Sequence, residues 1–238
     1  MPEQRKKRRP EQLPPGRHGL GRREVARSQR TRILDAVVAV VAEQGYPDAR
    51  VTDLIARAGV SRKTFYEHFA DKEECFLAAY DQTLAELLAA TTAGFEVGDD
   101  WPDRVREGLI AFLGVLADKP AAARMCIVEV LAAGPKALAR RDAAMRGFTH
   151  FIDAGRLEGP RGIPTFTAIG VLGGINEVLY AEIRRGATRD LPRLMPELLY
   201  WALLPFLGHE AAQEERRLAD EMQREEAVAA REAATRAS

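Results

Sequence analysis

A short segment of this chain carries side chains that could bind nucleic acid. Residues 61–68 read Ser-Arg-Lys-Thr-Phe-Tyr-Glu-His, so hydroxyl, cationic, phenolic and imidazole groups crowd into about two helical turns. Such groups donate hydrogen bonds to phosphate oxygens and to the edges of bases. Phe65 and Phe69 are four residues apart, so both can face a core and leave the polar groups on the other faces. A helix of this size fits the major groove of DNA.

The residues around this segment predict two short helices joined by a glycine turn, followed by a third helix. Thr52 can cap the first helix, and Gly59 can end it because glycine readily adopts the left-handed conformation. Ser61 can cap the second helix, and Asp71 the third. Lys72 would then lie at a helix N-terminus, where its charge and the free backbone amides favour a phosphate.

The run Gly-Val-Ser-x-x-Thr-Phe-Tyr-x-His-Phe over residues 59–69 resembles the DNA-binding signature of the tetracycline-repressor (TetR) family of bacterial regulators. This resemblance implies an all-α fold, with an N-terminal three-helix domain that binds DNA and a C-terminal helical domain for effector binding and dimerisation. The residues expected to contact DNA are Thr52, Ser61, Arg62, Lys63, Thr64, Tyr66, His68 and Lys72, together with Arg17, Arg22 and Arg23. The alternative is a helical hairpin whose polar face is merely solvated.

Charge is divided unevenly along the chain, although its formal net charge is zero. Residues 1–72 carry 16 Lys/Arg and 9 Asp/Glu, so the remainder is acidic. Residues 1–21 are rich in Pro, Gly and Arg and are expected to be disordered without DNA. They form either a basic arm that contacts phosphates or a minor groove, or a solvated tail that aids solubility.

The rest of the chain is expected to be helical, because no stretch alternates polar and apolar residues for long enough to predict a sheet. Helices are expected over residues 22–44, from 72 past 88, and over 102–117, 120–132, 135–155, 164–185 and 191–207. The expected divisions are an arm (1–21), a helix-turn-helix domain (22–72), an effector-binding and dimerisation domain (73–208) and a charged tail, helical or disordered (209–238).

Two strongly apolar stretches near the C-terminus predict a dimer interface. Residues 198–207 are apolar nearly all round, so this helix must be buried on several sides. A twofold four-helix bundle would bury the surface that a single chain leaves exposed, and the TetR resemblance implies an interface made by the last two helices. Packing within one chain is the alternative. The residues expected at the interface are Leu172, Leu194, Leu198, Leu199 and Leu203.

A pocket for a small apolar effector is expected in the same domain, where polar groups interrupt apolar stretches. The candidate lining residues are Phe112, Met125, Glu129, Phe148, Phe151, Asn176 and Tyr180. Each could instead belong to the core or face solvent, and the TetR resemblance does not name the ligand. No cofactor or metal ion is expected.

These patterns predict a cytoplasmic, dimeric transcriptional regulator, by default a repressor that an effector releases from a palindromic operator. An architectural DNA-binding protein without an effector is the alternative. The sequence lacks a nucleophile elbow, a phosphate-binding glycine loop and a metal-ligand cluster, so an enzyme is not expected. No apolar run reaches the length of a membrane span. Cys75 and Cys126 lack a Cys-x-x-Cys context and are expected to be buried thiols.

Overall fold

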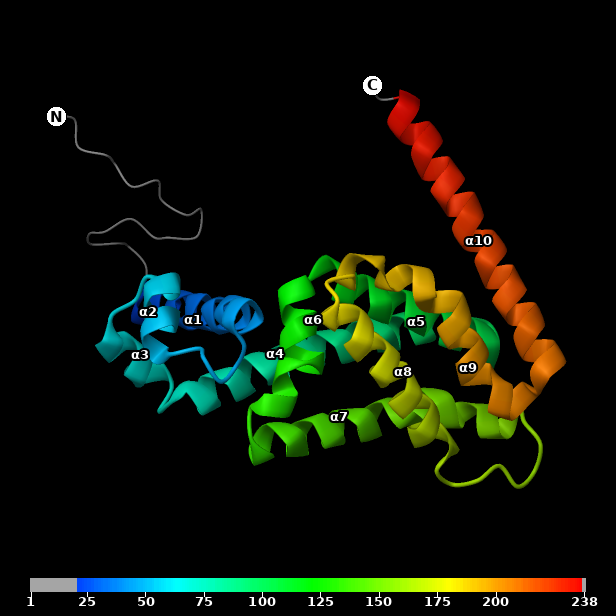
Figure 1. Ribbon diagram of the computed structural model, residues 1–238, viewed down its shortest axis with the longest axis horizontal. Helices are drawn as coiled ribbons and strands as arrows, with labels where there is room; N and C mark the ends of the chain where they lie inside the picture. Colours follow the sequence, from blue (N-terminus) through cyan, green and yellow to red (C-terminus); the bar gives the residue numbers. More distant parts are fainter. Residues whose placement is uncertain (1–20, 237–238) are drawn as a thin grey trace.

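The computed structural model describes residues 21–236, and the chain forms two helical domains joined by one long helix (Figure 1). The small domain at one end contains α1 (Arg22–Gln44), α2 (Val51–Ala58) and α3 (Arg62–His68). Helix α4 (Lys72–Phe95) begins beside these helices and runs into the larger domain. A change in the direction of α4 would therefore move the small domain.

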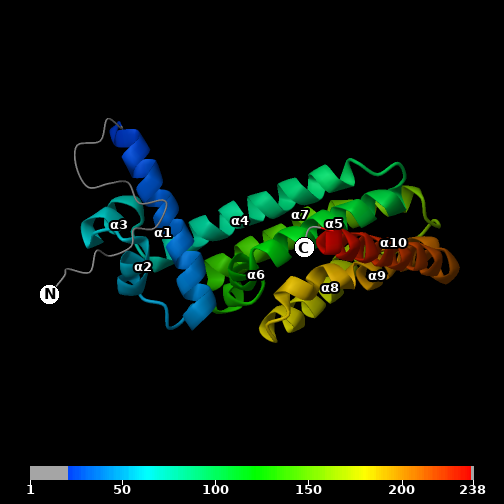
Figure 2. The same ribbon diagram turned by 90° about the horizontal axis from the view of Figure 1, so that it is seen from above.

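The larger domain contains the rest of α4, five further α-helices and three short 3₁₀ helices. The further helices are α5 (Trp101–Asp118), α6 (Pro120–Ile127), η1 (Glu129–Ala132), α7 (Pro135–Asp153), η2 (Ala154–Leu157), α8 (Thr167–Arg184), η3 (Thr188–Leu194) and α9 (Met195–Leu207). Helix α4 packs against α5, α6 and α7. The described residues contain no strand, which confirms the all-α prediction. Helix α1 packs against both α4 and α6, so the small domain contacts the larger one at two places (Figure 2).

Most of the expected helices are confirmed, with three local differences. The helix expected over 120–132 breaks at Val128, where α6 gives way to η1. The helix expected over 191–207 starts as the 3₁₀ helix η3, which contains Pro192. Thr52 is not a cap, because α2 begins one residue earlier and the Asp53 carboxylate accepts the Arg50 N–H at 3.0 Å.

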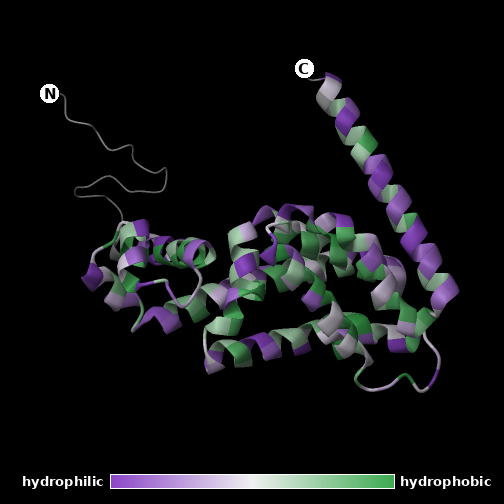
Figure 3. Ribbon diagram, in the orientation of Figure 1, coloured by the Kyte–Doolittle hydropathy of each residue, from purple (hydrophilic) through white to green (hydrophobic). Residues whose placement is uncertain are grey.

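The charged tail is a helix, α10 (His209–Arg236), over its described residues. Ala212 and Ala219 are buried against the larger domain, and Gln223 Nε2 donates to the Pro192 carbonyl at 2.7 Å. Beyond Gln223 the described side chains are all exposed, and α10 projects past the body as a largely hydrophilic rod (Figures 1 and 3).

No helix among residues 21–236 combines the length and hydropathy needed to cross a bilayer. The expected arm, including Arg17, lies outside the described residues except for Gly21.

Candidate DNA-binding surface and effector cavity

The helix-turn-helix is held together by caps and by two buried rings. Gly59 has φ of +64° and closes α2, while Ser61 Oγ accepts the Thr64 N–H at 3.0 Å and caps α3. Phe65 and Phe69 are 0% and 3% exposed, so they anchor α3 to the core as their spacing predicts. Because the N-terminus of α3 is capped and one of its faces is buried, its remaining faces are directed toward solvent.

The exposed faces of α3 carry the polar groups expected at DNA. Arg62, Lys63 and Tyr66 are exposed, and the Arg62 guanidinium lies 5.6 Å from the Tyr66 ring centroid. Thr64 is half-buried, and its hydroxyl lies 2.9 Å from that of Ser61. His68 is half-buried at the end of the helix. These groups form one contiguous polar surface on a single short helix.

The other expected DNA contacts lie on α1 and α2. Thr52 is exposed on α2, and Arg23 is exposed at the start of α1. Arg22 begins α1, but its side chain lies outside the description.

The expectation for Lys72 needs correction. Its Nζ donates to the carbonyls of Tyr46 at 2.7 Å and Ala49 at 2.8 Å, and it lies 4.2 Å from the Tyr46 ring centroid. Burial lowers the pKa of this ammonium, and the charge of Asp48 opposes that shift. Lys72 therefore faces the connection between α1 and α2 instead of an open helix N-terminus. The spacing of residues predicted that Lys72 lies at the start of a helix, but it did not predict the direction of the side chain.

The larger domain encloses an apolar cavity of about 120 Å³. Its walls come from α4, α5, α6, α7 and α8, and they include Tyr80, Leu84, Leu87, Phe95, Phe112, Cys126, Ile127, Arg141, Met145, Phe148, Phe151, Leu172 and Asn176. A second groove between α4 and α7 shares Leu84, Ala144 and Phe148 with this cavity. Helix α4, which leads to the DNA-binding domain, thus forms one cavity wall.

Four of the seven expected pocket residues line the cavity: Phe112, Phe148, Phe151 and Asn176. The other three are corrections. Met125 is fully buried in the core, and Tyr180 lies outside the cavity with the Arg184 guanidinium 5.5 Å from its ring centroid. Glu129 points to the small domain, since its carboxylate accepts the Tyr46 N–H at 3.0 Å.

The apolar stripe of α4 was the missed signal for the cavity. Tyr80, Leu84 and Leu87 recur at helical spacing, as core residues also do, so the sequence does not separate a cavity wall from a packed interior.

The polar groups of the cavity are few. Arg141 is the one charged side chain among the described lining residues, and Asn176 adds an amide. Burial raises the pKa of Tyr80 and also raises the pKa of Cys126 to about 12, so both stay protonated near neutral pH. The lining therefore suits a mainly apolar molecule with one polar or anionic group.

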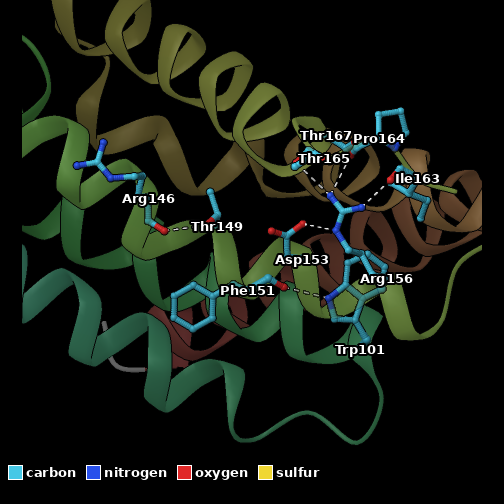
Figure 4. A network of polar contacts seen from close by, with 10 residues as sticks. All are labelled: Trp101, Arg146, Thr149, Phe151, Asp153, Arg156, Ile163, Pro164, Thr165 and Thr167. Atoms are coloured by element: carbon cyan, nitrogen blue, oxygen red, sulfur yellow. Dashed lines mark hydrogen bonds and ion pairs between the residues drawn. The ribbon is translucent and has the colours of Figure 1, made fainter.

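A polar network lies at the C-terminal end of α7 and includes Phe151 of the cavity wall (Figure 4). Trp101 Nε1 donates to the Phe151 carbonyl at 3.0 Å, which fixes the backbone behind one cavity ring. Arg156 pairs with Asp153 at 2.7 Å and donates to the Ile163 carbonyl at 2.7 Å. These bonds tie the segment before α8 to the end of α7.

The expected dimer residues also need correction. Leu198, Leu199 and Leu203 are at most 1% exposed, so they belong to the core of this chain and cannot face a partner. Leu172 lines the cavity, and Leu194 is half-buried against the core. The alternative of packing within one chain applies to Leu198, Leu199 and Leu203, and α10 covers one side of α9.

The helix-turn-helix domain is thus joined by one helix, α4, to a domain with an apolar cavity. Residues 33–79 match the family model of bacterial regulatory proteins of the tetR family. This match covers the helix-turn-helix domain, from within α1 to within α4, and over these residues the chain is similar to the tetR-family regulators.

Two curated relatives are regulators named for transcription or fatty acid metabolism. The HTH-type transcriptional activator FasR of Mycolicibacterium smegmatis is 30% identical over 105 residues, which cover 44% of this chain and 48% of FasR. The fatty acid metabolism regulator protein of Bacillus subtilis is 32% identical over 56 residues, 24% of this chain and 29% of that protein. The matched segments thus span about half of the first relative and less than a third of the second.

Solved structures share the fold over most of their length. The fatty acid degradation regulator FadR of Bacillus halodurans superposes with a TM-score of 0.67 at 19% identity, covering 74% of this chain and 94% of FadR. Bacillus subtilis FadR, solved in complex with stearoyl-CoA, superposes with a TM-score of 0.65 at 19% identity, covering 75% of this chain and 98% of that one.

Proposed function

We propose that this chain is a cytoplasmic, homodimeric repressor that leaves a palindromic operator when a long-chain acyl effector enters its cavity. One observation carries the proposal: α4 both lines the apolar cavity and leads directly into the helix-turn-helix. A ligand that favours a different direction of α4 would change the spacing of two recognition helices in a dimer. Such coupling between two sites is typically worth about 1–3 kcal/mol.

The DNA contacts proposed for α3 follow from the position of each side chain. Lys63 and Thr64 lie in its first turn, where side chains of a recognition helix reach base edges. Phosphate contacts are proposed for the other polar groups of the surface and the preceding segment, namely Thr52, Ser61, Arg62, Tyr66, His68, Arg17, Arg22 and Arg23.

The dimer face is proposed on α8 and α9, at positions different from those expected. Gly170, Gly173 and Ala181 recur at helical spacing along α8, and all three are exposed. On α9 the Trp201 side chain is 39% exposed and borders Gly174 of α8. Small residues beside an exposed indole allow the close approach that a second copy needs, and a twofold dimer would present two α3 helices to a palindrome.

An acyl effector is supported by the chemistry of the cavity and by the relatives. The walls are apolar, and FadR of Bacillus subtilis binds stearoyl-CoA. Helices α4 and α7 both run away from the small domain (Figure 1), so Tyr80 and Arg141 lie nearer to it than Phe95 and Phe151. We place the polar head near Arg141 and the acyl chain toward the two phenylalanines, with the α4–α7 groove as its continuation.

Binding of palmitate and palmitoyl-CoA, followed by calorimetry and thermal unfolding, tests this proposal. Ligands that bind only the folded state raise the midpoint of unfolding, and Phe148→Glu should abolish the effect because it places a charge in the apolar wall. Acetate and acetyl-CoA are the matched ligands that lack the chain. An architectural protein without an effector, the alternative function, would show no shift with any of the four.

A further inference from the structure

The two domains are joined outside α4 by a buried carboxylate. The Glu129 side chain in η1 is 8% exposed, and its Oε1 lies 3.0 Å from Arg124 Nη2 of α6. Its Oε2 accepts the backbone N–H of Tyr46 at 3.0 Å. Tyr46 follows Gly45, which ends α1 with φ of +85°. One carboxylate thus connects the larger domain to the α1–α2 connection of the DNA-binding domain.

The same connection is held from its other side by the start of α4. Lys72 donates to the carbonyls of Tyr46 and Ala49, and the Tyr46 ring packs edge-on against Phe76 with centroids 4.9 Å apart. The residues that carry α2, and through it α3, are therefore held between η1 and α4. Loss of either contact would loosen the α1–α2 connection, although α1 still packs on α4 and α6.

The carboxylate also lies next to the cavity in the chain. Cys126 and Ile127 line the cavity, and they stand between Arg124 and Glu129 in the sequence. A ligand that displaces these two residues must move one or both members of the ion pair. Charge-assisted hydrogen bonds need close geometry, and a buried carboxylate that loses its partners is costly. The ion pair with Arg124 and the hydrogen bond from the Tyr46 N–H are therefore expected to break together.

We infer that Glu129 is a positioning residue that carries the state of the cavity to the DNA-binding domain. With the cavity empty it holds the Tyr46 N–H and keeps the recognition helix in its DNA-competent direction. A molecule in the cavity shifts the end of α6 and releases that N–H. This inference rests on the proposed effector function of the cavity.

A double-mutant cycle on the full-length protein tests the inference without any ligand. Cys126→Phe fills the cavity beside α6, and operator affinity is measured on a site selected from random DNA by the wild-type protein. In the wild-type background Cys126→Phe should weaken operator binding about 10-fold or more, within the usual range of coupling between sites. In a Glu129→Ala background the same change should alter affinity less than about 3-fold.

Two further variants separate the roles of the carboxylate. In a Glu129→Gln background, Cys126→Phe should weaken operator binding to an intermediate degree. The amide oxygen can still accept the Tyr46 N–H, but it has no charge to pair with Arg124. Glu86→Ala is the matched control, since Glu86 of α4 pairs with Lys119 inside the larger domain. In the Glu86→Ala background, Cys126→Phe should weaken operator binding as much as it does in the wild-type background. Thermal unfolding of each variant checks that it is folded.

Hydrogen exchange of the peptide that contains Tyr46 gives a second readout, taken without DNA. Cys126→Phe should speed its exchange in the wild-type background and leave it unchanged in Glu129→Ala, where it is already fast. A full response in Glu129→Ala would overturn the inference, and so would a Cys126→Phe protein unchanged in both readouts. Failure of palmitoyl-CoA to bind would count against the proposed effector alone, because this cycle uses no ligand.

Discussion

The Lys72 ammonium lies 4.2 Å from the centroid of the Tyr46 ring and donates to the Tyr46 carbonyl at 2.7 Å. The first residue of α4 is thus bonded to the connection between α1 and α2. This contact makes the junction of the domains a packed unit instead of a flexible hinge. It also assigns to Lys72 a bracing role in place of the phosphate contact that its sequence position indicates.

Replacing Lys72 by methionine should therefore lower the free energy of unfolding and leave the salt dependence of DNA binding nearly unchanged. Two hydrogen bonds from a half-buried ammonium are lost, and we expect a cost of about 1–2 kcal/mol in the free energy of unfolding. Urea denaturation measures this cost. A Lys72→Met protein of unchanged stability, with the log–log salt slope of DNA binding flattened by about 0.9 per subunit, would indicate a phosphate contact instead.

The recognition helix should lose specificity when its first turn is altered. Lys63→Ala and Thr64→Ala should each cost about 1–3 kcal/mol on the preferred site and relax preference at one or two base positions. Selection of binding sites from random DNA reads out the preference. Glu43→Gln is the control, because Glu43 is exposed on α1 of the same domain and pairs with Arg57 of α2. Unchanged sequence preference in both alanine variants would show that α3 does not contact the bases.

The proposed dimer should dissociate when charge is placed on its exposed face. Gly173→Glu and Trp201→Glu should give monomers in sedimentation at micromolar concentration and lose tight operator binding, since the pair of recognition helices is broken. Leu157→Glu is a matched control, because Leu157 is 93% exposed and lies outside the α8–α9 face. Monomers in this control, or intact dimers in both face variants, would place the interface elsewhere.

The alkylation rates of Cys75 and Cys126 should distinguish binding in the cavity from a change in global stability. Burial raises the pKa of Cys75 and Cys126 from 9.0 to about 12, which lowers the thiolate fraction at about pH 8 roughly 1000-fold. Because the folded pKa values are raised, the protonated thiols stabilise the fold below about pH 9, and this stabilisation is lost as pH rises toward 12.

Alkylation by iodoacetamide should therefore be slow in the folded protein and fast in urea. Palmitate should slow it further at Cys126, which lines the cavity, and leave Cys75 unaffected. Single-cysteine variants assign the two rates. Equal protection of both thiols would mean that the ligand acts on global stability and does not occupy the cavity.

The helices and the exposed polar surface of α3 could be predicted from sequence because their signals are local. Glycine, serine and proline mark helix ends within a few residues, and the spacing of Phe65 and Phe69 identifies the buried face of α3. The resemblance to TetR regulators rests on the same short run, which lies within the matched residues 33–79.

The direction of individual side chains in the larger domain could not be predicted, because it depends on distant contacts. Leu199 and Trp201 belong to one apolar run, yet the first is buried and the second exposed. Nothing in that run shows which side α10 covers. Glu129 interrupts an apolar stretch as a ligand-binding residue would, but the break of α6 at Val128 turns it to Tyr46 instead.

The central claim is that an acyl chain in the cavity controls DNA binding, and operator affinity measured with and without palmitoyl-CoA tests it most directly. Fluorescence anisotropy of a labelled operator gives the dissociation constant at saturating palmitoyl-CoA and at the same concentration of acetyl-CoA. We predict that palmitoyl-CoA weakens operator binding about 10-fold or more and that acetyl-CoA leaves it unchanged. The same operator affinity with palmitoyl-CoA bound and absent would contradict the claim.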